Sequence, residues 1–83
     1  MLLAVDIGNS ETTMGAFVGT EIVGRWRFST DPSRTADEHA LLISGLLRGL
    51  KNDEVEIGSA AICSVVPTVT ETIYSVLEGI SAE

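Results

Sequence analysis

The apolar residues at the start of the chain predict a buried strand. Residues 2–5 are apolar without alternation, and the run ends at Asp6 and Gly8. An apolar run of this length that ends near a glycine is typical of a strand covered on both faces of a sheet. The turn-forming residues Asn9 and Ser10 follow, so we expect the chain to reverse direction there.

Two further strands are predicted over residues 12–18 and 21–29. The first segment is rich in residues that favour strands, and the second alternates between apolar and polar positions. Residues 19 and 20 leave room only for a tight turn between them. Strands joined by so short a connection must be antiparallel.

The hydrophobic period becomes helical after these strands. Thr35 and Glu38 fit a capping box, and apolar residues then recur every three or four positions as far as Leu50. Residues 59–66 form a second apolar run, interrupted by Ser64, which predicts another strand covered on both faces. A proline and a second capping-box pattern, at residues 68–71, open a helical apolar period that runs from Val69 to Ile80. The predicted order is β-β-β-α-β-α.

Composition narrows the function classes. Five Lys and Arg against twelve Asp and Glu give a formal net charge of -7 over 83 residues. Nucleic acids and anionic membranes are bound mainly through Lys and Arg contacts to phosphate, so we expect neither as a partner. The single His and single Cys exclude a Cys/His zinc site and an internal disulfide. With no signal peptide and no apolar run long enough to span a membrane, the sequence predicts a cytoplasmic protein of at most one domain.

The segment from Asp6 to Thr13 carries the most informative chemistry. A buried strand would place the Asp6 carboxylate at its C-terminal end, directly before a glycine turn and several hydroxyl groups. Backbone N–H groups of such a turn bind phosphate oxygens, and the carboxylate can hold magnesium or its waters. The alternative is a plain hairpin turn in which Asp6 accepts hydrogen bonds from turn amides. The cost of a charge at the end of an apolar strand favours the phosphate site.

Four motifs in order cover nearly the whole chain: DIGNS at 6–10, TTMGAF at 12–17, STDPSRTADE at 29–38 and SVVP at 64–67. Together they resemble the N-terminal part of type III pantothenate kinases, which belong to the superfamily of acetate and sugar kinases, Hsp70 and actin. The resemblance implies an α/β fold of the ribonuclease-H/actin-like type with a mixed sheet. The chain would be the incomplete first domain of a two-domain kinase, with its last strand left at a sheet edge.

The resemblance also implies roles for individual residues. The first ATP-phosphate motif would comprise Asp6, Ile7, Gly8, Asn9, Ser10, Glu11, Thr12 and Thr13. Asp6 would orient magnesium through its waters, and Gly8, Asn9, Ser10 and Thr12 would contact phosphate. Glu11 falls at a position where members of the family vary, often with Asn, Gln or His. Its carboxylate is electrostatically unfavourable beside a triphosphate.

The implied activity is ATP-dependent phosphorylation of pantothenate to 4′-phosphopantothenate, the first step of coenzyme A biosynthesis. The full-length family is expected to be a homodimer that uses magnesium-ATP and a monovalent cation, potassium or ammonium. The G-x-D-R segment with the catalytic base would lie beyond residue 83, so no residue here is assigned as catalytic and we expect this chain alone to be inactive. Two alternatives stay open: a non-catalytic relative of the Bvg accessory factor type, and a truncated module without activity.

The remaining reactive side chains have structural interpretations. His39 is expected at the surface of the first helical turn, and Cys63 is expected to be an inert buried thiol. Arg25 and Arg27 share one strand face and are either solvated or in contact with a phosphate. Ser64 is placed at the same cleft edge as Asp6, where it would approach a ligand.

Overall fold

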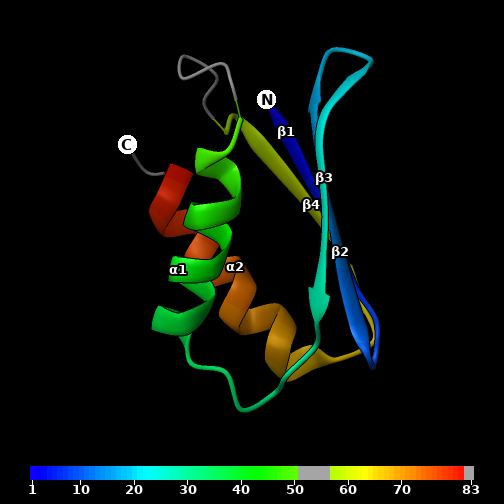
Figure 1. Cartoon of the computed structure of the whole chain (residues 1–83). Helices are drawn as coiled ribbons and strands as arrows, with labels where there is room; N and C mark the ends of the chain where they lie inside the picture. The colour runs from blue at the N-terminus through cyan, green and yellow to red at the C-terminus, as the bar shows by residue number, and fades with distance from the viewer. Residues whose placement is uncertain (51–56, 82–83) are drawn as a thin grey trace.

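A computed structural model describes residues 1–50 and 57–81 of the chain. Four strands form one sheet, and two helices pack beside it (Figure 1). In chain order the elements are β1 (Leu2–Ile7), β2 (Glu11–Val18), β3 (Glu21–Ser29), α1 (Ala36–Arg48), β4 (Ser59–Ser64) and α2 (Pro67–Ser81). The predicted β-β-β-α-β-α order is confirmed.

The sheet is mixed, as predicted, with the strand order β3-β2-β1-β4. β1 pairs antiparallel with β2, and β2 pairs antiparallel with β3 through the tight turn between them. β4 pairs with the other side of β1 and runs parallel to it, after the chain has passed through α1. Within the described part of the chain β4 has one strand neighbour, so it forms an edge of the sheet as expected.

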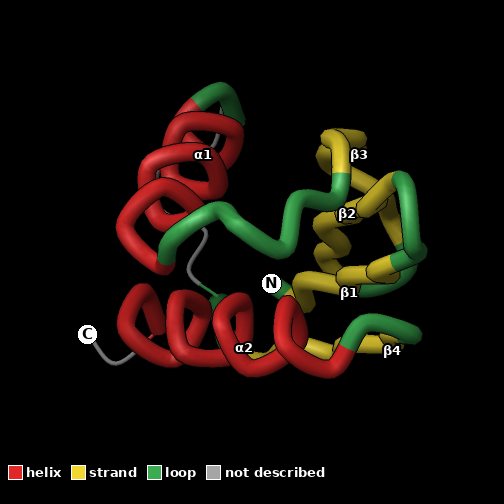
Figure 2. The backbone as a smooth tube through the Cα atoms, turned by 90° about the horizontal axis from the view of Figure 1, so that it is seen from below, coloured by secondary structure: helices red, strands yellow, loops and turns green. Residues whose placement is uncertain are grey.

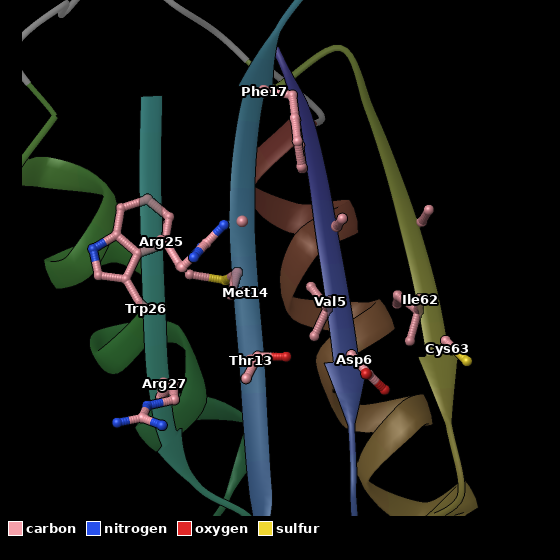
Figure 3. Close-up of a pocket in the computed structure, with 13 residues that line it drawn as sticks. Val5, Asp6, Thr13, Met14, Phe17, Arg25, Trp26, Arg27, Ile62 and Cys63 are labelled. Atoms are coloured by element: carbon pink, nitrogen blue, oxygen red, sulfur yellow. The ribbon is translucent and has the colours of Figure 1, made fainter. Parts of the chain in front are cut away.

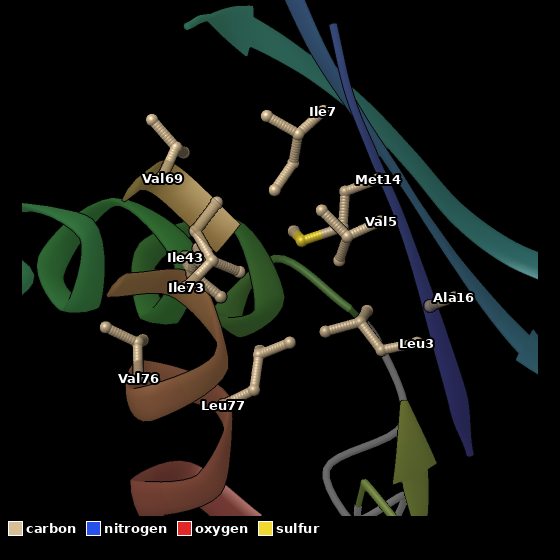
Figure 4. Packing of buried hydrophobic residues seen from close by; sticks show 10 residues of the cluster. All are labelled: Leu3, Val5, Ile7, Met14, Ala16, Ile43, Val69, Ile73, Val76 and Leu77. Carbon is tan, nitrogen blue, oxygen red and sulfur yellow. The ribbon is translucent and has the colours of Figure 1, made fainter. Parts of the chain in front are cut away.

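Both helices cover the same face of the sheet (Figure 2). The buried core lies between this face and the helices, and α1 and α2 also pack against each other. Its members come from two strands and both helices (Figure 4): Leu3, Val5, Ile7, Met14, Ala16, Ile43, Val69, Ile73, Val76 and Leu77. The helical periods read from the sequence therefore point inward.

The expectation that the strands at residues 2–5 and 59–66 are covered on both faces is wrong for this chain. In β1, Leu3 and Val5 are buried, whereas Leu2 is 39% exposed. β4 contains no buried residue. The physical reason is the placement of both helices on one face, because successive strand residues point to opposite faces. The apolar runs indicate more coverage than the two helices supply.

The helix starts follow the local chemistry in one case and depart from it in the other. At α1 the capping box is confirmed: the Glu38 N–H donates to Thr35 Oγ1 at 3.1 Å, and the Thr35 N–H donates to Glu38 Oε1 at 2.8 Å. α2 begins at Pro67 and not after a second capping box. Proline suits the first helical position because it has no N–H to leave unsatisfied.

Replacing Ile43 by alanine tests the helix–sheet core. Ile43 is fully buried, so Ile43→Ala should lower the free energy of unfolding by about 2–4 kcal/mol through lost burial and a residual cavity. Leu41, on the same helix, is 77% exposed, and Leu41→Ala should change it by less than about 0.5 kcal/mol. Urea unfolding followed by circular dichroism measures both. Equal midpoints for the two variants would contradict this packing.

Candidate functional site

The turn between β1 and β2 is short and constrained. The Gly8 N–H donates to the carbonyl of Glu11 at 2.9 Å, and a Cβ on Gly8 would lie only 3.0 Å from that oxygen. A side chain at this position would therefore crowd the turn, which favours glycine there. The Asn9 and Ser10 side chains are exposed, and no described residue hydrogen-bonds to their N–H groups. These two N–H groups thus have no protein acceptor among the described residues.

The segment of residues 6–13 is divided between the two faces of the sheet. Asp6 and Thr13 are register partners in the β1–β2 ladder, and both side chains lie on the face away from the helices. Ile7 and Thr12 are also partners, but they are buried on the helix side. The Thr12 hydroxyl is hydrogen-bonded to that of Thr30 at 2.8 Å.

A row of polar side chains crosses the open face beside the turn (Figure 3). Strand register places Cys63 next to Asp6, Asp6 next to Thr13, and Thr13 next to Arg27. A hollow of about 930 Å³ lies over this face, and Arg25 lines it one row further from the turn. The open face thus combines a carboxylate, a hydroxyl, a thiol and two guanidinium groups.

One ion pair is present within the described ranges. Arg27 Nε lies 3.9 Å from Glu11 Oε2, and the two side chains are 70% and 54% exposed. A pair so exposed contributes at most about 1 kcal/mol to stability. The position of the pair matters more than its contribution to stability, because the contact places the Glu11 carboxylate near β3.

The site suits magnesium only in the presence of a ligand. Residues 1–50 and 57–81 contain no group of three or more His, Cys, Asp or Glu side chains that could hold a metal ion. Magnesium in nucleotide sites is bound by one or two carboxylates, with waters and substrate phosphates completing its shell. The exposed carboxylate of Asp6 beside the turn fits that pattern.

Comparison with known proteins identifies the family. The family model for type III pantothenate kinase matches residues 2–81. The chain belongs to the type III pantothenate kinase family.

Relatives from several bacteria resemble the chain closely. The type III pantothenate kinase of Salinispora arenicola is 45% identical over 78 residues, which cover 94% of this chain and 30% of the relative. That of Streptomyces coelicolor is 46% identical over 80 residues, and that of Pelobacter propionicus 44% over 78; each alignment covers 92% of this chain and 30% of the relative. The chain therefore spans about 30% of the length of these relatives.

The sequence predictions for the exposure of Cys63 and His39 are wrong, and Ser64 faces the side of the sheet opposite to the one expected. Cys63 is exposed and not buried, because it lies on the open face of an edge strand. Ser64 is the partner of Ile7 and so lies on the helix side, opposite Asp6. Its hydroxyl accepts a hydrogen bond from the Val66 N–H at 2.9 Å, which occupies it locally.

Neither helix in the described ranges is long and apolar enough to cross a membrane.

His39 is buried, with 1% of its surface exposed, although it was expected at the surface. Its ring packs against Phe28 at a centroid distance of 6.4 Å, and Nδ1 lies 3.3 Å from the carbonyl oxygen of Thr35. Nε2 is buried with no hydrogen-bond partner in the described part of the protein. The spacing to Ile43, one helical turn on, is the signal that could have placed His39 on the inner face.

Burial lowers the pKa of His39, and the nearby charge of Arg34 lowers it further. The Thr35 carbonyl and the carboxylates of Glu38 and Asp31 act in the opposite direction but do not reverse the shift. Hydrogen bonds from the Ser33 hydroxyl and N–H lower the pKa of Asp31. Burial therefore disfavours the charged form of His39 inside the fold.

Acid should destabilise the chain through His39. Because its pKa is lowered in the folded state, the unfolded chain binds the proton more readily, and the free energy of unfolding should fall as the pH drops below 6.5. Asp31, whose pKa is also lowered in the folded state, adds a loss of the same sign as the pH approaches and falls below 3.8. Urea unfolding at several pH values above 3.8 measures the slope, and His39→Leu should flatten it. Identical slopes in the two proteins would show that His39 does not cause the loss.

Proposed function

We propose that the protein to which this chain belongs transfers a phosphoryl group from ATP to pantothenate, giving 4′-phosphopantothenate. The family match over residues 2–81 carries this proposal, together with relatives that are themselves named type III pantothenate kinase. Residues 6–13 would supply the phosphate-binding hairpin. The free N–H groups of Asn9 and Ser10 beside the exposed Asp6 carboxylate support that assignment.

We further propose that residues 1–83 are the incomplete first domain of a two-domain, actin-like kinase. The supporting feature is the sheet order, in which a central β1 has an antiparallel meander on one side and a parallel strand on the other. A homodimer, a cytoplasmic location and activation by potassium or ammonium rest on the family resemblance alone.

In this mechanism the chain acts by binding and orientation. The N–H groups of Asn9 and Ser10 would donate to phosphate oxygens, and the Gly8 constraint would hold them in place. Asp6 would hold magnesium through its waters, and that ion would neutralise charge on the polyphosphate. No described residue is assigned as the base that takes the proton of the pantothenate hydroxyl. That group would come from another part of the protein.

The phosphate hairpin can be tested by titrating the chain with magnesium-ATP. Amide signals of Gly8, Asn9 and Ser10 should move in NMR spectra, with a dissociation constant on the order of millimolar because much of the nucleotide site is absent. Asp6→Asn should reduce the dependence of these shifts on magnesium. Asp37→Asn, which removes an exposed carboxylate from the first turn of α1, serves as the matched control.

The outcome that would contradict the hairpin assignment is equally specific. Shifts centred on Arg25 and Arg27, with the turn amides unmoved, would place the nucleotide elsewhere on the open face. An Asp6→Asn variant with unchanged magnesium dependence would remove the metal-orienting role of that carboxylate.

The 83-residue chain alone should not phosphorylate pantothenate. The hairpin provides neither a base nor a pantothenate pocket, and loss of substrate positioning removes much of the rate. ADP release measured with and without pantothenate tests this, with the Streptomyces coelicolor type III pantothenate kinase as positive control. Pantothenate-dependent ADP release by the purified chain would show that the base lies within it.

A further inference from the structure

Glu11 places a negative charge directly after the phosphate turn. It is the first residue of β2, and strand alternation puts its side chain on the same open face as Thr13 and Asp6. A carboxylate free to swing over the turn would oppose a polyphosphate and would compete with it for magnesium. A working phosphate turn therefore needs this carboxylate to be held aside.

Arg27 is the residue that contacts the Glu11 carboxylate. Arg27 lies opposite Thr13 on β3, whereas Glu11 lies opposite Ser29, so the pair at 3.9 Å is diagonal across the two strands. Because Thr13 lies two residues further from the turn than Glu11, the contact is directed toward β3 and away from the turn. In Figure 3 the Arg27 side chain on β3 and the Asp6 side chain on β1 extend away from each other. A carboxylate paired with Arg27 therefore lies away from the Asp6 carboxylate.

The chain contains a matched cation that lacks this contact. Arg25 lies on the same strand and the same open face, two residues from Arg27, opposite Gly15. The ion pair of the described residues joins Arg27 to Glu11 and does not involve Arg25. A comparison of Arg27 and Arg25 variants therefore distinguishes the effect of the Arg27–Glu11 contact from the effect of positive charge on this face.

We propose that Arg27 is a positioning residue for the phosphate hairpin. Its guanidinium group holds the Glu11 carboxylate over β3, which leaves the N–H groups of Asn9 and Ser10 and the carboxylate of Asp6 open to magnesium-ATP. This proposal rests on the function proposed above. It assigns to Arg27 the role of offsetting the negative charge of Glu11 next to the phosphate turn.

The test compares magnesium-ATP affinity in a set of variants of the 83-residue chain at one fixed, low ionic strength. The dissociation constant is taken from the amide shifts of Gly8, Asn9 and Ser10. Arg27→Gln should weaken binding about two- to five-fold, the range expected from a surface ion pair. Arg27→Lys, which keeps the charge and can still pair, should restore most of the affinity.

Measurements in a chain that carries Glu11→Gln show whether Arg27 acts through Glu11. If Arg27 acts through Glu11, Arg27→Gln should lose most of its effect in a chain that already carries Glu11→Gln. Arg25→Gln should change affinity equally in both backgrounds, because it has no pair to break. Both members of the ion pair are exposed, so thermal unfolding should be nearly unchanged in every variant, which excludes loss of fold as the cause.

Three results would overturn the role of Arg27. Equal losses from Arg27→Gln and Arg25→Gln would leave only an effect of net charge. An undiminished loss from Arg27→Gln in the Glu11→Gln background would mean direct contact with the nucleotide and no positioning. If no variant shows hairpin shifts with magnesium-ATP, the phosphate site itself fails, and the role of Arg27 fails with it. That last result differs from the first two, in which binding persists.

Discussion

β1 is hydrogen-bonded along both of its edges, and the rest of the structure depends on this double pairing. The antiparallel register with β2 and the parallel register with β4 fix which residues of β1 face the helices. Leu3, Val5 and Ile7 enter the core, and the residue between the last two, Asp6, faces the open side. A slip of one residue would exchange the two sets, so the core and the candidate site are set by one constraint.

The segment between β3 and α1 connects the hairpin to the first helix. The Thr30 N–H donates to the Ser10 carbonyl at 2.9 Å, and the Thr30 hydroxyl meets that of Thr12. Arg34 Nη1 donates to the Ser29 carbonyl at 3.0 Å, and Thr35 then caps α1. These contacts connect the candidate phosphate turn to the start of α1. Thr30, Arg34 and Thr35 of the motif at residues 29–38 thus have structural roles.

The two faces of the sheet differ in chemistry because both helices lie on one of them. One face is covered by both helices and carries the apolar cluster, while the other combines exposed or half-buried apolar residues with the row from Cys63 to Arg27. The chain spans about 30% of the length of its relatives, and its apolar runs at β1 and β4 suit coverage on both faces. Its own helices provide coverage on one.

The sequence by itself determined the order of elements, the capping box of Thr35 and Glu38, and the tight turn at Gly8. These depend on period and on contacts within a few residues, which a local pattern records. Only the tertiary structure decided that His39 is buried and Cys63 exposed, because exposure depends on which face distant helices cover. It also decided that Thr12, and not Thr13, faces the helices, and that Glu11 meets Arg27. These follow from strand register and one-sided helix packing, which bring together residues far apart in the sequence.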